Sequence, residues 1–273
     1  MIRLHVNSLI VAAIILVALT AGVVQAEVVL QDANSTVYIT PDSQVGMHSW
    51  IVDSTSYDAQ QWFWYRIGTT GGESSIDTLG LASVSQTQSN YATFVYGNTN
   101  SPLIVTLVSN LLGDEPGTGS SDINELIRLK NNTTSSMTLS FFEYNNYILS
   151  ANDTVAFDNL NHVTQYGHSD ILQENYNSGT GEGVVTGAPS HEAALYPITL
   201  NELNDGSPTT FTNINAAGPG NVTWAFEWDV TIAAGKTFTI SKDKLLNVPE
   251  PSSIVLLAVF GACLAIAGLR GKK

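Results

Sequence analysis

The sequence is poor in cysteine, which a disulfide-stapled protein would need, and poor in basic residues, which a nucleic-acid-binding protein would need. Among its 273 residues there is one cysteine, Cys263, so an intramolecular disulfide is excluded. Lys and Arg number 10 against 24 Asp and Glu, and the formal net charge is −14. A surface of this sign repels phosphate groups, which argues against nucleic acid as a partner.

Local motifs of common enzymes are also missing. Between the two ends of the chain there is no Gly-x-Ser-x-Gly elbow, no Walker loop and no His-Glu-x-x-His. The sequence therefore predicts no catalytic residues, no cofactor and a protein that is not an enzyme. A catalytic triad or a pair of carboxylates that meets only in three dimensions stays open, because sequence spacing does not reveal it.

The first 26 residues have the three parts of a secretory signal peptide. Arg3 and His5 give a basic start, and an uncharged apolar run extends from Leu9 to Leu19. The small residues of Val24-Gln25-Ala26 then form a cleavage site before Glu27. Residues 1–26 are therefore predicted to direct export, with an uncleaved N-terminal anchor as the alternative.

A second apolar segment lies near the C-terminus, from about residue 252 to residue 269. As a helix it would be about 27 Å long, close to the thickness of the hydrocarbon core of a bilayer. The basic residues that follow it are predicted to stay in the cytoplasm: Arg270, Lys272 and Lys273.

The residues just before this apolar segment carry the most specific motif of the chain. Val248-Pro249-Glu250-Pro251-Ser252-Ser253 precedes the apolar helix and the basic end. Each proline fixes its own φ and disfavours helix in the residue before it, so the motif is held extended with one carboxylate exposed. The order of these parts resembles the PEP-CTERM sorting signal, although the basic end has one Arg and two Lys in place of an Arg-rich cluster.

The resemblance covers residues 248–273 and implies a processing partner. In that family an exosortase-type membrane enzyme recognises the motif, here Pro249, Glu250 and Pro251. The protein would then be an inner-membrane-anchored precursor with its ectodomain outside the cytoplasm, and would finish at the cell surface or in the extracellular matrix. An ordinary single-pass anchor is the alternative.

Residues 27–247 are predicted to form a mainly β ectodomain, an antiparallel β-sandwich. Apolar and polar residues alternate over short runs that end at turn residues, as in Thr36–Thr40, Trp62–Ile67 and Tyr91–Tyr96. Two hairpins are expected, one over Ile123–Tyr147 and one over Val222–Ile240 with Gly235 in the turn.

The densest aromatic run contains Trp62 and Trp64, which alternation places on one face of a strand. If that face is exposed, the two rings could stack on a sugar. If the strand is buried on both faces, they belong to the core, which is the interpretation we favour because sandwiches commonly bury tryptophan.

Metal binding has weak support in the sequence. His162 and His168 do not have the tight, repeated spacing of zinc ligands. The acids of the Gly-rich segment could offer oxygen ligands to Ca²⁺ but match no loop consensus: Asp114, Glu115 and Asp122. No metal site is therefore predicted.

These features favour an exported surface or matrix protein with a structural or interaction role linked to exopolysaccharide or biofilm. A carbohydrate-binding module is the alternative, with Trp62 and Trp64 as its platform, and an extracellular hydrolase comes third. An exposed tryptophan face would favour the second hypothesis, and a cleft with paired catalytic groups the third.

Overall fold

The computed structural model describes residues 27–159, 161–168, 170–178 and 190–248. The predicted signal peptide, the Pro-Glu-Pro motif, the apolar segment and the basic end lie outside these residues. Within the described residues no helix is long and apolar enough to cross a membrane.

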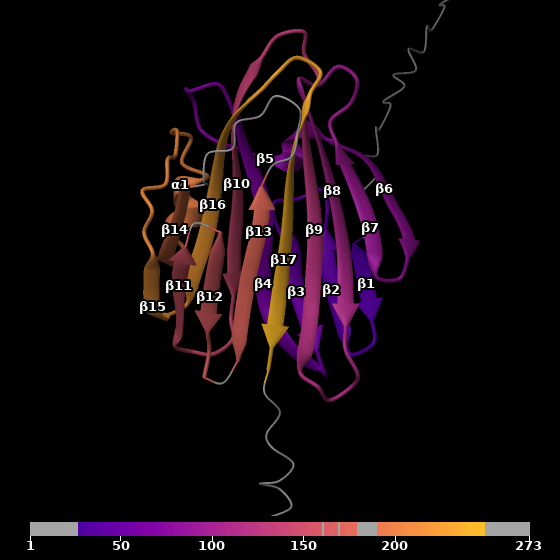
Figure 1. Cartoon of the computed structure of the whole chain (residues 1–273), viewed down its shortest axis with the longest axis vertical. Coiled ribbons are helices and arrows are strands. Elements are labelled where there is room, and N and C mark those ends of the chain that lie inside the picture. Colours follow the sequence, from indigo (N-terminus) through magenta and orange to yellow (C-terminus); the bar gives the residue numbers. More distant parts are fainter. Residues whose placement is uncertain (1–26, 160, 169, 179–189, 249–273) are drawn as a thin grey trace, which may run out of the picture.

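The described chain folds into two antiparallel β-sheets packed face to face, which confirms a mainly β, sandwich-like fold (Figure 1). In order across the first sheet, its described strands are β1 (Val28–Asp32), β2 (Ser35–Thr40), β3 (Gly46–Val52), β4 (Thr55–Ile67), β10 (Met137–Tyr147), β16 (Val222–Ile232) and β14 (Ser190–Leu195), with β5 (Ser74–Ser75) paired to β4. We call this sheet A.

The second sheet, sheet B, lies in front in Figure 1. In order across it, the described strands are β15 (Ala216–Gly220), β11 (Asp153–Asn159), β12 (His162–Tyr166), β13 (Ile171–Ser178), β17 (Thr237–Asn247), β9 (Ser120–Asn131), β8 (Leu103–Gly113), β7 (Tyr91–Tyr96) and β6 (Leu81–Gln88). Two short helices complete the described elements, the 3₁₀ helix η1 (Ile76–Leu79) and the α-helix α1 (Ile198–Glu202).

Both predicted hairpins are wrong, although their strands exist. β9 and β10 follow one another in the chain but lie in different sheets, and so do β16 and β17. The partners are exchanged: β10 pairs with β16, and β9 pairs with β17. These two short connections, residues 132–136 and 233–236, therefore cross from one sheet to the other instead of turning back within one.

The two crossings are held side by side by one buried asparagine. The Asn131 side-chain amide donates to the carbonyl oxygens of Ser135 and Ile232, each at 2.8 Å. Its backbone N–H donates to the carbonyl of Lys236 at 2.9 Å. Alternation correctly predicts each strand, but it carries no information about which strand becomes the neighbour.

Sheet A is buried on both faces along its central strands. In β8, buried and half-buried residues alternate, whereas every residue of β10 except Thr138 is buried. One face of β10 meets sheet B. The other, outer face is covered by the chain around η1 and by the long β14–β15 connection, where Phe211 packs edge-on against Phe142 with ring centroids 5.6 Å apart.

Candidate functional site

Trp62 and Trp64 lie on the outer face of sheet A beneath this cover, and they are 1% and 0% exposed. The Trp62 indole N–H donates to Ser75 Oγ at 2.8 Å, and that of Trp64 donates to Asn204 Oδ1 at 3.4 Å. Neither ring presents a free face to a sugar. The stacking platform proposed for an exposed strand is therefore absent, and both rings are core residues.

Arg66 follows the two tryptophans on the same face of β4 and is the centre of a polar cluster. Its guanidinium forms an ion pair with Glu73, whose side chain is fully buried. It also donates to the carbonyl oxygen of Thr209 at 2.8 Å and to Ser140 Oγ at 3.0 Å. Arg66 thereby joins β4, the approach to η1, and the β14–β15 connection.

Glu227 on β16 is the second charged group of this cluster. One carboxylate oxygen accepts the backbone N–H of Phe211 at 2.7 Å, and the other lies 3.9 Å from the Arg66 guanidinium. Burial raises the pKa of Glu227 to about 7, with Asp229 and Glu73 acting in the same direction and the Phe211 N–H and Arg66 opposing it. Glu227 is thus a carboxyl group that exchanges a proton near neutral pH.

A surface hollow of about 340 Å³ opens beside this cluster. Its lining is polar and rich in hydroxyl groups: Arg66, Gly68, Thr69, Thr138, Ser140, Thr210, Asp229, Val230 and Thr231. Ser140 Oγ donates to Asp229 Oδ1 at 2.5 Å, which orients an exposed carboxylate at the mouth. Glu227 is not part of the lining but lies directly behind it, between Arg66 and the chain at Phe211.

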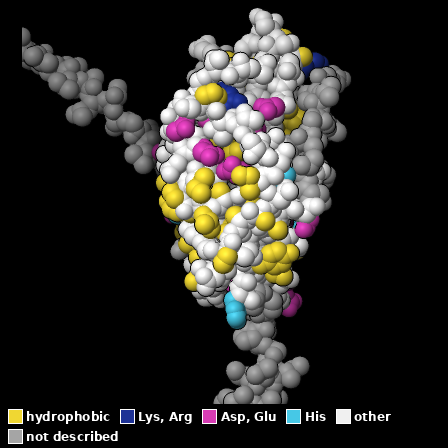
Figure 2. Space-filling model, turned by 90° about the vertical axis from the view of Figure 1, so that its left-hand side faces the viewer, with side chains coloured by type: hydrophobic (Ala, Val, Ile, Leu, Met, Phe, Trp, Pro, Cys, Tyr) yellow, Lys and Arg dark blue, Asp and Glu magenta, His cyan; other side chains and the backbone are white. Residues whose placement is uncertain are grey.

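A second hollow of about 370 Å³ lies on the other side of the same connection and shares Thr210 with the first. Glu192, Glu202 and Asp205 supply its charge. Burial raises the pKa of Glu202, and the neighbouring Glu192 and Asp205 add to the effect. Figure 2 shows acidic side chains gathered above a broad apolar area on the side of the molecule that carries α1, β14 and β15.

The residues considered for metal binding do not converge. Asp114 and Glu115 are exposed in the β8–β9 connection, and Asp122 lies within β9. His162 pairs with Asp158 at 2.6 Å, while His168 is exposed. Across the described ranges, no three His, Cys, Asp or Glu side chains form a group that could hold a metal ion.

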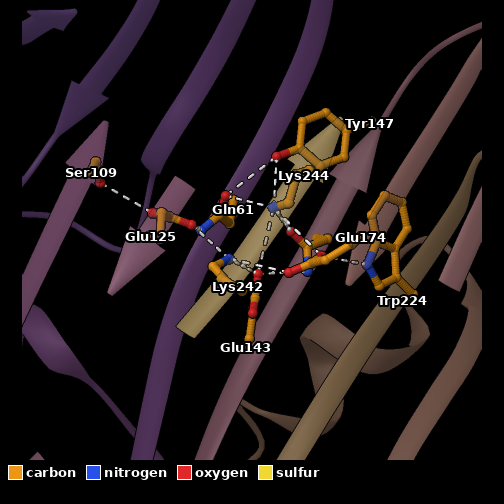
Figure 3. Close-up of polar contacts among 10 residues, drawn as sticks. Gln61, Ser109, Glu125, Glu143, Tyr147, Glu174, Trp224, Lys242 and Lys244 are labelled. Carbon is orange, nitrogen blue, oxygen red and sulfur yellow. Dashed lines mark hydrogen bonds and ion pairs between the residues drawn. The ribbon is translucent and has the colours of Figure 1, made fainter. Parts of the chain in front are cut away.

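A cluster of charges that the motif search missed lies in the sandwich interior (Figure 3). We call it the interior ion cluster, and its ionic members are Lys242, Lys244, Glu125, Glu143 and Glu174. Both lysines come from β17 and point between the sheets, where they are 2% and 0% exposed. The sequence did contain a signal: alternation from Phe238 and Ile240 puts both lysines on the apolar face of β17.

The charges in this cluster are nearly all paired. Lys242 Nζ contacts Glu125 at 2.6 Å, Glu174 at 3.4 Å and Glu143. Burial raises the pKa of Glu143 to about 7, Glu174 acts in the same direction, and the two lysines oppose it. A void beside Gln61 and Glu125, at the edge of this cluster, measures only about 10 Å³ and is too small for a ligand.

Comparison with known proteins gives a result for the fold only. No protein-family model matches the chain, and no curated protein matches it. A solved structure from Escherichia coli K12, assigned as an aldose 1-epimerase, has a TM-score of 0.50 and 8% identity, covering 82% of this chain and 99% of that one. The fold is similar to that of an aldose 1-epimerase.

A solved structure of a galactose mutarotase related enzyme from Lactobacillus acidophilus has a TM-score of 0.44 and 8% identity over 83% of this chain and 99% of that one. The likeness to an enzyme contradicts two predictions made from the sequence: that the protein is not an enzyme, and that its role is structural or interaction-based. The first prediction rested on missing local motifs and the second on the two terminal segments, whereas this fold brings polar groups such as Arg66 and Glu227 together from strands far apart in the chain.

Proposed function

We propose that the described domain acts on the anomeric carbon of an aldose, in the hollow beside Arg66 on the outer face of sheet A. The observation that carries the proposal is Glu227, a carboxyl with a pKa of about 7, placed two residues before Asp229 on the same face of β16. The likeness in fold to an aldose 1-epimerase supports it.

Interconversion of anomers needs one group that removes the proton of the anomeric hydroxyl and one that protonates the ring oxygen. The ring then opens to the aldehyde, rotates and closes, and both protons return, so no other reactant is consumed. A carboxyl with a pKa near 7 is present in both protonation states at neutral pH, which suits this exchange. Asp229 would act as the base and Glu227 as the acid.

The spacing of the two carboxyl groups fits a single sugar ring. Residues two apart on one face of a strand have Cα atoms about 6.6 Å apart. Arg66 lies 3.9 Å from Glu227 and lines the hollow together with Asp229, so its positive charge can stabilise negative charge that develops on a sugar oxygen. The hydroxyls of Thr69, Thr138 and Thr231 line the same hollow and can exchange hydrogen bonds with those of the sugar. Contact with Glu227 requires the stretch around Thr210 to move aside.

The test is the rate at which freshly dissolved α-D-glucose and α-D-galactose approach their equilibrium rotation in a polarimeter. We expect the purified protein to accelerate this over buffer, and Glu227→Gln and Asp229→Asn each to lower the acceleration by about 100-fold, the usual scale for removing an acid or base. Asp205→Asn, in the second hollow, is the matched control and should keep it. A wild-type rate equal to buffer with all aldoses tried would refute the proposal.

We also propose that the domain works outside the cytoplasm, since the two terminal segments predict export and anchoring. This rests on the sequence alone. The exosortase-type enzyme and the inner membrane are the partners that follow from it.

A further inference from the structure

Lys244 and Asn145 face one another across the sandwich interior. Lys244 lies on β17 at the centre of sheet B, and Asn145 lies on β10 at the centre of sheet A. Both residues are fully buried. The Lys244 Nζ is 2.7 Å from Asn145 Oδ1, although the two residues are 99 positions apart in the chain. An amine and a carboxamide are thus held in contact where water is excluded.

A third group touches both of them. Glu143 Oε1 accepts a hydrogen bond from Asn145 Nδ2 at 3.1 Å, and the same oxygen lies 3.5 Å from Lys244 Nζ. One carboxylate oxygen therefore contacts both the amine that could attack and the nitrogen that would leave. A group in this position can carry protons from the first to the second.

We propose that Lys244 and Asn145 form an intramolecular isopeptide bond, with Glu143 as the proton carrier, which ties the two sheets together covalently. The Nζ–Cγ bond forms and the Cγ–Nδ2 bond breaks. Of the three protons on the Lys244 ammonium, one stays on the new amide and two pass through Glu143 to the leaving nitrogen. That nitrogen departs as ammonium, Glu143 ends as it began, and no oxidant or other reactant is required.

The surroundings favour this reaction as a slow, single event. Burial alone would lower the pKa of Lys244, but the neighbouring carboxylates outweigh it and raise the pKa, so the neutral, nucleophilic form is the minor one. Groups fixed in contact nevertheless react as though at very high concentration, with effective molarities of about 10⁵ M or more for well-oriented pairs. Loss of ammonium to solvent makes the step irreversible, and the new amide is shielded from hydrolysis.

Lys242 and Gln61, the other amine and the other side-chain amide of this cluster, are less suited to forming an isopeptide bond. Lys242 contacts carboxylates, which are poor acceptors for an amine because they are already negatively charged. Gln61 Oε1 also lies 2.7 Å from Lys244 Nζ, but its amide nitrogen donates to Glu125. Glu125 pairs with Lys242, so the Gln61 amide does not share a carboxylate with the attacking amine in the way that Asn145 does.

The test is mass spectrometry of the purified full chain, first intact and then after proteolysis with chymotrypsin. We expect an intact mass about 17 Da below that calculated for the observed termini, from the loss of one ammonia, and a branched peptide that contains both Asn145 and Lys244. The branched peptide is decisive, because cyclisation at some other asparagine would also release ammonia but would join no second peptide.

Variants separate the roles of the three residues. Glu143→Gln keeps both joined groups and should abolish or greatly slow the cross-link, while Lys242→Met keeps the Lys244–Asn145 pair and should allow it. Failure of a variant to fold leaves the wild-type measurement decisive. Unbranched peptides for Asn145 and Lys244 in the wild type, after prolonged incubation, would overturn the proposal, as would a branch to Gln61.

Discussion

Replacing Trp62 by Ala tests the arrangement of the outer face of sheet A. The side chain is 1% exposed and packs edge-on against Tyr96 with ring centroids 5.9 Å apart. Loss of a buried tryptophan usually costs about 3–5 kcal/mol. The Ser75 hydroxyl would also lose the indole N–H, which adds about 1 kcal/mol. We therefore expect the free energy of unfolding to fall by about 4–6 kcal/mol, a large part of the 5–15 kcal/mol typical of a domain.

The assay is equilibrium unfolding in guanidinium chloride, followed by circular dichroism. In heat denaturation the same loss should lower the melting temperature by about 8–24 °C, at 2–4 °C per kcal/mol for a domain of this size. Tyr166→Ala is the control, since Tyr166 is a large aromatic residue that is 43% exposed, and it should change stability by no more than about 0.5 kcal/mol. A loss below about 1 kcal/mol for Trp62→Ala would show that the indole is not packed beneath the cover.

Three further predictions follow from the same description. Gly46→Ala would put a Cβ 2.2 Å from the Trp62 ring at a φ of +58° and should lower the free energy of unfolding by about 2–4 kcal/mol. Gly235→Ala, at a φ of +69° with open space around the new Cβ, should cost only the backbone strain of about 1–2 kcal/mol, as measured by denaturant titration. The pKa of Glu227 is about 7 in the folded state and 4.5 in the unfolded state, so the folded state keeps a proton that the unfolded state releases above pH 4.5. The contribution of Glu227 to the free energy of unfolding is therefore full below pH 4.5 and is lost as pH rises to about 7. A Glu227→Gln variant that loses as much stability as wild type over that window would contradict the assignment. Alanine in place of the Pro-Glu-Pro motif should block processing or relocation in a host that has an exosortase, as seen by fractionation and immunoblotting, and unchanged processing would leave the tail as a plain anchor.

The positions of several strands could be predicted, and their pairing could not. The alternating runs at Thr36–Thr40 and Tyr91–Tyr96 correspond to β2 and β7. The expected hairpins failed because a short polar connection is compatible both with a turn inside one sheet and with a crossing between two. The choice was made by contacts between distant segments, such as the amide of Asn131 with the carbonyl of Ile232.

The candidate site was beyond the reach of motif searching. Arg66 and Glu227 come from β4 and β16, strands far apart in the chain that lie on either side of β10 in sheet A. Nothing near either residue in the sequence indicates that they will be neighbours. The raised pKa of Glu227 is a product of burial under the β14–β15 connection, so it too exists only in the folded protein.

The sequence by itself determined the strand-forming runs, the side chains that share a face of each strand, the acidic balance and the impossibility of an internal disulfide. These are properties of composition or of a period of two residues, and both are local. The tertiary structure decided that the Trp62 face is covered, that Lys242 and Lys244 meet three carboxylates, and that β9 and β10 separate into different sheets. Each of these depends on the energy of burying one segment against another that is distant in the chain, and that energy is shared by the whole fold rather than encoded at either segment.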